Sequence, residues 1–123
     1  MRRALAACLA AALAAPLAAP GVAQERTTRG QGAILRGLDR VNGHTQDLDL
    51  ATGETTEFGS LRVRLDECRL PAENPDGDAY AFMTIHSTDT DARLFSGWML
   101  ASSPALNALE HQRYDVWVLR CKT

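Results

Sequence analysis

Two cysteines, Cys68 and Cys121, constrain the fold of this 123-residue chain more than any other feature. A third cysteine, Cys8, lies inside an N-terminal segment with the pattern of a cleavable export signal, and it would leave with that segment. An even pair of cysteines in an exported domain is typical of one structural disulfide. Such a bond would tie the C-terminus to the middle of the domain. A redox-active pair is the alternative, but the spacing contains no Cys-x-x-Cys motif.

The export signal is predicted over residues 1–23. Arg2 and Arg3 precede an apolar run of alanine and leucine, and the small residues Gly21 and Ala23 suit a signal peptidase. The apolar run is too short and too poor in large side chains to indicate a membrane anchor. We therefore expect cleavage near Ala23, residence in the periplasm, and no membrane-spanning segment after cleavage.

The rest of the chain has the length of one small domain. Residues 24–32 are polar and predict a disordered leader, and residues 33–123 predict a single β-rich domain. After cleavage, 11 basic and 15 acidic residues remain, which gives a net charge of −4. The arginines are scattered and form no basic stripe, which argues against nucleic acid and anionic lipid as partners.

Short apolar segments separated by turn signals predict a mainly β fold, either a small antiparallel β-sandwich or a partly open barrel. Asn42-Gly43 predicts a type I′ hairpin, because both central residues of that turn need positive φ. Apolar and polar residues alternate in 61–66, as in a half-buried strand. We expect 80–86 to be covered on both faces, Gly97 to be a possible bulge in 93–100, and 114–121 to lie centrally in a sheet.

One short helix is predicted after the strand over 93–100. Ser103 can cap its first turn and Pro104 suits its first position. The apolar side would be formed by Ala105, Leu106, Ala108 and Leu109.

The alternation of side chains raises a difficulty for the disulfide. Cys121 shares a strand face with Trp117, whereas Cys68 is out of phase with Leu65 and the apolar residues before it. A bulge near Glu67 would resolve this, and we expect one there. On the same reasoning Trp117 points into the core, while Tyr114 is partly exposed toward a partner.

No residue pattern indicates a metal or cofactor. The three histidines, His44, His86 and His111, lack the spacing of a metal site, and the acidic turn residues do not follow an EF-hand order. A serine hydrolase would recruit Ser96, Ser102 or Ser103 with His111 and Asp115. Ser96 lacks the first glycine of a Gly-x-Ser-x-Gly elbow, and no strand–elbow–helix unit surrounds it.

The C-terminal third carries a resemblance to a known family. The run from Leu94 to His111, Leu-Phe-Ser-Gly-Trp-Met-Leu-Ala-Ser-Ser-Pro-Ala-Leu-Asn-Ala-Leu-Glu-His, and the run Tyr-Asp-Val-Trp-Val-Leu-Arg-Cys from Tyr114 resemble domain-of-unknown-function family 2155 of alphaproteobacteria. The resemblance spans roughly residues 33–122, and two of the family's cysteines fall on Cys68 and Cys121. It implies an exported protein of a Gram-negative bacterium with no established activity. The family's genes often lie near that of an accessory subunit of respiratory complex I.

Two hypotheses for the function follow. The first is a non-enzymatic periplasmic protein that binds or buttresses a protein partner, such as an envelope or respiratory membrane complex. Its candidate partner or ligand patch comprises Ser96, Trp98, Ser102, His111, Tyr114 and Asp115. The second is a small envelope hydrolase or ligand-binding domain that uses Ser96, Ser102, His111 and Asp115.

Overall fold

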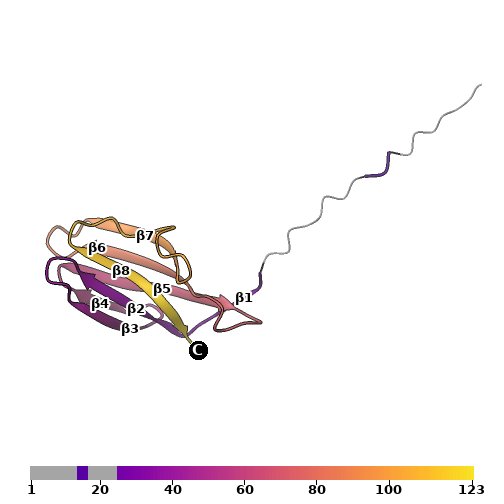
Figure 1. Cartoon of the computed structure of the whole chain (residues 1–123), viewed down its shortest axis with the longest axis horizontal. Coiled ribbons are helices and arrows are strands. Elements are labelled where there is room, and N and C mark those ends of the chain that lie inside the picture. Colours follow the sequence, from indigo (N-terminus) through magenta and orange to yellow (C-terminus); the bar gives the residue numbers. More distant parts are fainter. Residues whose placement is uncertain (1–13, 17–24) are drawn as a thin grey trace, which may run out of the picture.

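The computed structural model describes residues 14–16 and 25–123, and it shows two antiparallel sheets that pack face to face (Figure 1). The larger sheet has the order β1-β5-β6-β7, with β4 also paired to β5, and the smaller has the order β3-β2-β8. The prediction of a mainly β, antiparallel fold is confirmed, with two sheets that do not close into a barrel. The bounds are β1 Thr27–Arg29, β2 Gly32–Asp39, β3 Thr45–Ala51, β4 Thr55–Phe58, β5 Leu61–Pro71, β6 Tyr80–Ser87, β7 Arg93–Leu100 and β8 Tyr114–Lys122.

The expected signal peptide, residues 1–23, lies outside the described residues except for 14–16, which have no regular structure. The expectation of a disordered leader is wrong for residues 25–32. Thr27–Arg29 form β1, which pairs with the end of β5, and the amide of Gly30 donates to the carbonyl of Cys68. This short polar segment is ordered because a sheet edge satisfies its backbone groups.

The hairpin between β2 and β3 is confirmed, but its turn differs from the one predicted. Gly43 has a φ of 73°, whereas Asn42 is not in the left-handed region. The turn spans residues 40–44, and it is closed by hydrogen bonds between Asp39 and both Gly43 and His44. The Asn42 side chain accepts a hydrogen bond from the His44 amide, so asparagine stabilises the turn through its side chain rather than through a positive φ.

The core lies between the two sheets and is built from alternate residues of every long strand. Leu61, Val63 and Leu65 of β5 are fully buried, as their alternation predicts. In β6 the inward residues are Ala81, Met83 and Ile85, while the residues between them are half-buried on the outer face. The prediction that 80–86 is covered on both faces is therefore wrong.

Strand β8 departs from expectation in two ways. It is an edge strand paired only with β2, not a central one. Its inward residues are Tyr114, Val116 and Val118, so Tyr114 is only 5 % exposed and Trp117 is half-buried on the outer face. The predictions of an exposed Tyr114 and of Trp117 in the core are both wrong.

Two bulges explain these differences and bring the cysteines together. The register of β5 with β6 shifts between Leu65 and Glu67, which confirms the expected bulge and turns Cys68 inward. A second shift, in the pairing of β2 with β8, leaves Leu119 without a partner. Because a bulge reverses the face of every residue beyond it, Tyr114 and Cys121 both point inward.

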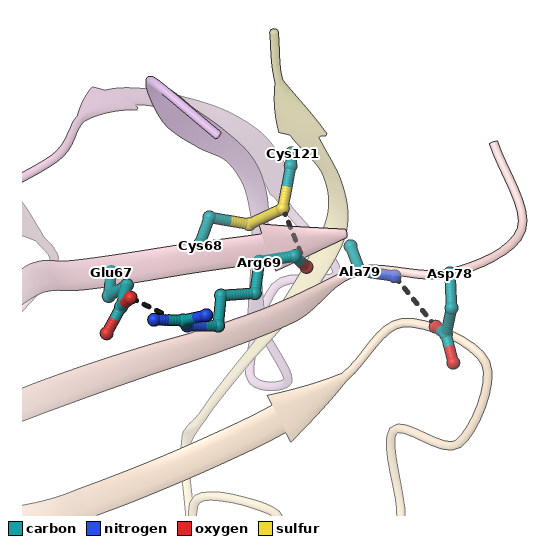
Figure 2. Close-up of a disulfide and its surroundings, with 6 residues drawn as sticks. All are labelled: Glu67, Cys68, Arg69, Asp78, Ala79 and Cys121. Atoms are coloured by element: carbon teal, nitrogen blue, oxygen red, sulfur yellow. Dashed lines mark hydrogen bonds and ion pairs between the residues drawn. A yellow bond between two sulfur atoms is a disulfide. The ribbon is translucent and has the colours of Figure 1, made fainter. Parts of the chain in front are cut away.

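The disulfide between Cys68 and Cys121 is confirmed, with their Cα atoms 5.7 Å apart. It joins β5 of one sheet to β8 of the other, as Figure 2 shows. Cys68 is fully buried and Cys121 packs at the margin of the core. The bond therefore links the two layers of the sandwich directly.

The predicted short helix is absent from the described residues, where 101–113 form a loop of turns and bends between β7 and β8. Ser103 does not act as a helix cap, and its carbonyl accepts a turn hydrogen bond from the Leu106 amide. Only Leu109 of the apolar residues is buried, whereas Leu106 is 72 % exposed. A helix this short is unstable without a buried side, and here the chain instead stretches between fixed anchor points.

The Asn107 side chain is one of these anchors, because its amide donates to the carbonyl of Trp98 on the free edge of β7. A side chain on Gly97 would collide with this amide, which lies 2.8 Å from the position of an added Cβ. The loop thus occupies a backbone acceptor of an edge strand, and such edges otherwise attract other chains.

Candidate functional site

The outer face of β6 and β7 carries an apolar surface that the described part of the chain leaves partly exposed. Tyr80 and Phe82 of β6 and Trp98 and Leu100 of β7 lie on it, and we call these four residues the aromatic patch. Phe82 lies directly opposite Trp98 in the sheet, with ring centroids 5.3 Å apart in an edge-to-face arrangement. Trp98 is 37 % exposed, a large value for a tryptophan that packs against another ring.

A polar rim borders the aromatic patch on the side of β5 and β1. Glu67 of β5 accepts a hydrogen bond from Arg69 at 2.8 Å and pairs with Arg29 of β1 at 3.0 Å. The Tyr80 hydroxyl donates to Glu25 at 3.2 Å. An apolar centre within a charged border is the usual composition of a protein-binding surface.

The six residues predicted as a single patch lie in three different settings. Ser96 and Trp98 share the outer face of β7. Ser102 lies in the loop beyond β7, where its hydroxyl and amide donate to Asp78 at 2.7 and 3.0 Å. His111, Tyr114 and Asp115 lie together at the start of β8.

The contact between Ser102 and Asp78 fastens one loop to another. Burial alone would raise the pKa of Asp78, but hydrogen bonds from Ser102 and from the Ala79 amide outweigh it and hold that pKa below its ordinary value. Figure 2 shows Asp78 next to Ala79, just before the start of β6. The lowered pKa makes the Asp78 carboxylate a weaker base toward the Ser102 hydroxyl, which disfavours activation of that hydroxyl as a nucleophile.

A hollow of about 780 Å³ lies between the loop over 75–78 and the last residues of β8. Its charged groups include Asp78, which Ser102 holds, and Lys122, which pairs with Asp49. Both contacts lie at the end of the sandwich that contains the disulfide.

His111 and Asp115 are both tied to Arg40. The guanidinium of Arg40 donates to the His111 carbonyl at 2.6 Å and pairs with the Asp115 carboxylate at 3.4 Å. The Nδ1 atom of His111 accepts hydrogen bonds from the amides of Arg113 and Tyr114. The imidazole therefore caps the start of β8 and contacts neither serine of the hydrolase hypothesis.

The sequence interpretation missed an ion pair between a nearly buried aspartate and a half-exposed arginine. Asp39 is 7 % exposed, and both of its oxygens accept hydrogen bonds from the guanidinium of Arg113 at 2.9 to 3.2 Å. This guanidinium holds the pKa of the Asp39 carboxyl below its ordinary value. The sequence gives little sign of this pair, because the two residues are 74 positions apart and each stands beside a segment that reads as a turn.

The two β6 aromatics were also missed as site residues. Tyr80 and Phe82 alternate with Ala81 and Met83, and an outer row of aromatics beside an inner row of apolar residues could have indicated an uncovered face. Within residues 14–16 and 25–123, no group of three or more histidine, cysteine, aspartate or glutamate residues could hold a metal ion. The same residues contain no helix long and apolar enough to cross a membrane.

Comparison with known proteins relates this fold to an uncharacterised family. The chain is 31 % identical over 87 residues to the uncharacterized protein RP359 of Rickettsia prowazekii (strain Madrid E), and the match covers 68 % of this chain and 56 % of the relative. The chain thus spans little more than half the length of that curated relative. No solved structure gives a significant match. The family model of DUF2155, described as an uncharacterized protein conserved in bacteria, matches residues 33–121, and the chain therefore belongs to this family.

Proposed function

We propose that this domain is an exported, periplasmic binding protein without catalytic activity, and that it serves as an accessory to an envelope or respiratory membrane complex. The observation that carries the proposal is the aromatic patch. Monomeric domains rarely leave several aromatic side chains together on one face without a binding role. Tryptophan and tyrosine are also the side chains that most often dominate the energy of protein interfaces.

The disulfide supports an extracytoplasmic location, because such bonds persist in oxidising compartments. The arrangement of the polar residues favours binding over hydrolysis. Ser102 donates to Asp78, and Asp115 pairs with Arg40, so these side chains do not converge with His111 on a common point.

The test compares two tryptophan variants in cells that make the protein naturally. Trp98 lies on the outer face of the larger sheet and Trp117 on that of the smaller one, so Trp117→Ala is a matched control for Trp98→Ala. Intact complexes are recovered from a mild detergent extract of the envelope and resolved by mass. We expect the complex to be lost with Trp98→Ala and kept with Trp117→Ala, while both variants keep cooperative unfolding. Equal recovery with both variants would contradict the proposal.

A further inference from the structure

The aromatic patch contains a slot between two of its side chains. A hollow of about 390 Å³ is lined by Tyr80, Trp98 and Leu100, with Glu25, Thr27 and Arg69 along its border. Tyr80 lies opposite Leu100 in the sheet, and Phe82 opposite Trp98. Tyr80 and Trp98 are therefore diagonal neighbours on adjacent strands.

The diagonal spacing of Tyr80 and Trp98 limits the shape of a group that can bind between their side chains. Diagonal neighbours on one face of an antiparallel pair stand about 7–8 Å apart. When one ring lies between two side chains and contacts both, the two side chains are also about 7–8 Å apart, because each van der Waals contact takes about 3.5–4 Å. The register of β6 with β7 therefore gives Tyr80 and Trp98 a spacing that matches one flat or compact ring between their side chains.

The walls of the slot are held before any ligand arrives. Phe82 packs its ring against Trp98, and the Tyr80 hydroxyl donates to Glu25. On the border, Arg69 donates to Glu67 and to the Thr27 hydroxyl. Side chains that are already fixed lose little entropy when a partner binds.

The chemistry of the slot separates two kinds of ring. The rings of Tyr80 and Trp98 offer apolar surface, whereas the acceptors of Glu25 and Thr27 lie on the border. A guanidinium inserted between the rings would therefore leave several donors unpaired, at a high cost in free energy. Proline has no N–H group, and its ring packs without leaving a donor unsatisfied. Proline-rich segments also hold an extended conformation in solution and bind to aromatic-lined grooves at low entropic cost.

The charges on the border add a second requirement. Arg69 is paired with Glu67, whereas Glu25 accepts only the Tyr80 hydroxyl and has no ion-pair partner among residues 14–16 and 25–123. Burial raises the pKa of the Tyr80 phenol, and the negative charges of Glu25 and Asp78 raise it further. On this border, which also carries Arg69, the Glu25 carboxylate is therefore the acidic group that is available to a cation.

We propose that the slot binds an extended segment of a partner protein, with a proline ring between Tyr80 and Trp98 and an adjacent arginine or lysine paired with Glu25. This inference rests on the proposed function, because it names the chemistry of the partner at the same surface. The proline supplies shape complementarity and the neighbouring cation supplies charge complementarity.

The experiment titrates the purified, disulfide-bonded domain with the peptide acetyl-Ala-Pro-Pro-Arg-Pro-Ala-amide. Binding is followed by NMR through the two indole N–H signals. We expect the signal of Trp98 to move and that of Trp117 to stay. Trp98→Ala should weaken binding at least tenfold, as at other interface hot spots, and Glu25→Gln should weaken it about fivefold, since an exposed ion pair contributes up to about 1 kcal/mol.

Two control peptides test the two parts of the inference. Replacing the prolines by alanine should abolish the shift of Trp98, and replacing the arginine by glutamine should reduce affinity as much as Glu25→Gln does. Equal binding of the alanine peptide would overturn the assignment of proline, and equal binding of the glutamine peptide would overturn that of the cation. If no peptide moves the Trp98 signal while Trp98→Ala still loses the native complex, this inference fails and the proposed function stands. If Trp98→Ala keeps the native complex, the proposed function itself fails.

Discussion

Individual side chains at the start of β8 hold the end of the sandwich together. The ring of Tyr114 packs edge-on against Phe58 with centroids 5.6 Å apart, and it lies over Gly59. Gly59 has a φ of 56°, and an added Cβ would overlap the tyrosine ring. Glycine is thus required at this position both by the backbone conformation and by the ring.

We predict that Tyr114→Ala destabilises the domain by about 3–5 kcal/mol, because it removes a large side chain from the core. Tyr114→Phe is the matched control, since it keeps the ring and should cost less than half as much. Urea unfolding of both variants measures the difference. A stable Tyr114→Ala domain would show that the aromatic ring contributes nothing to the core.

The ion pair between Asp39 and Arg113 makes a pH-dependent contribution to stability. The pKa of Asp39 is lowered in the folded state from an ordinary value of about 3.9. At a pH between the pKa of Asp39 in the folded state and its higher pKa in the unfolded state, the unfolded chain therefore binds the proton more readily. The ion pair contributes its full stabilisation when the pH is above the pKa of Asp39 in the unfolded chain. This stabilisation is lost as the pH falls through the pKa of Asp39 in the folded state.

We predict that Asp39→Asn lowers the melting temperature at neutral pH, and that the difference from the unchanged protein narrows below about pH 4. Asp89→Asn is the control, because Asp89 is exposed and its carboxylate forms no ion pair within the described part of the chain. Melting curves across the acid range measure the effect. A difference that stayed constant with pH would exclude ionisation of Asp39 as its source.

At the scale of elements, the loop over 101–113 covers the side of the sandwich between β7 and β8. Its sequence matches the signals of a capped helix, but a helix would place Leu106 and Leu109 on one side and bury both. In the structure only Leu109 reaches the core, at 3 % exposure. The attachments of Ser102 and Asn107 hold the rest of the loop at the surface.

We predict that Leu109→Ala destabilises the domain by about 2–4 kcal/mol, whereas Leu106→Ala changes stability by less than about 0.5 kcal/mol. Because the same substitution is made at two positions of one loop, the difference between the variants reports the burial of the leucine rather than a general effect of alanine on the loop. Chemical denaturation measures the free energy of unfolding of both variants. Comparable losses at the two positions would indicate a helix that buries them together.

The strands could be predicted from sequence to the extent that alternation marks one face. The alternation in 61–66 identified the inner face of β5, and the mismatch with Cys68 indicated the bulge near Glu67. The bulge at Leu119 left no such mark, because Val116 to Leu119 are all apolar and either face could be the buried one. The inner and outer residues of β8 were therefore exchanged. The same ambiguity concealed the aromatic patch, since its rings resemble core residues until the pairing of β6 and β7 is known.

At the scale of the whole molecule, few connections hold the two sheets together besides apolar contact. Apart from the backbone connections between strands, the disulfide is the one covalent link between the described parts of the sheets, and it lies at the end of the sandwich where β1, β5 and β8 meet. At the opposite end Tyr114 of β8 packs against Phe58 of β4 across the two sheets, and the pair of Asp39 and Arg113 joins β2 to the start of β8 within the smaller sheet. The two sheets are thus joined by a disulfide at one end and by packed aromatic rings at the other.

We predict that Cys68→Ser combined with Cys121→Ser lowers the free energy of unfolding by about 4 kcal/mol. The cysteines are 53 residues apart, and the chain-entropy model assigns about that value to a loop of this length. Total stability of a small domain is about 5–15 kcal/mol, so the variant should still fold at low temperature but unfold far more easily. Urea unfolding of the variant, and of the unchanged protein with and without reductant, measures the effect.

Because the bond acts mainly on the unfolded chain, the NMR signals of Trp98 and Tyr80 should stay in place in the folded variant. Loss of these signals together with the bond would show instead that the disulfide shapes the aromatic patch in the native state.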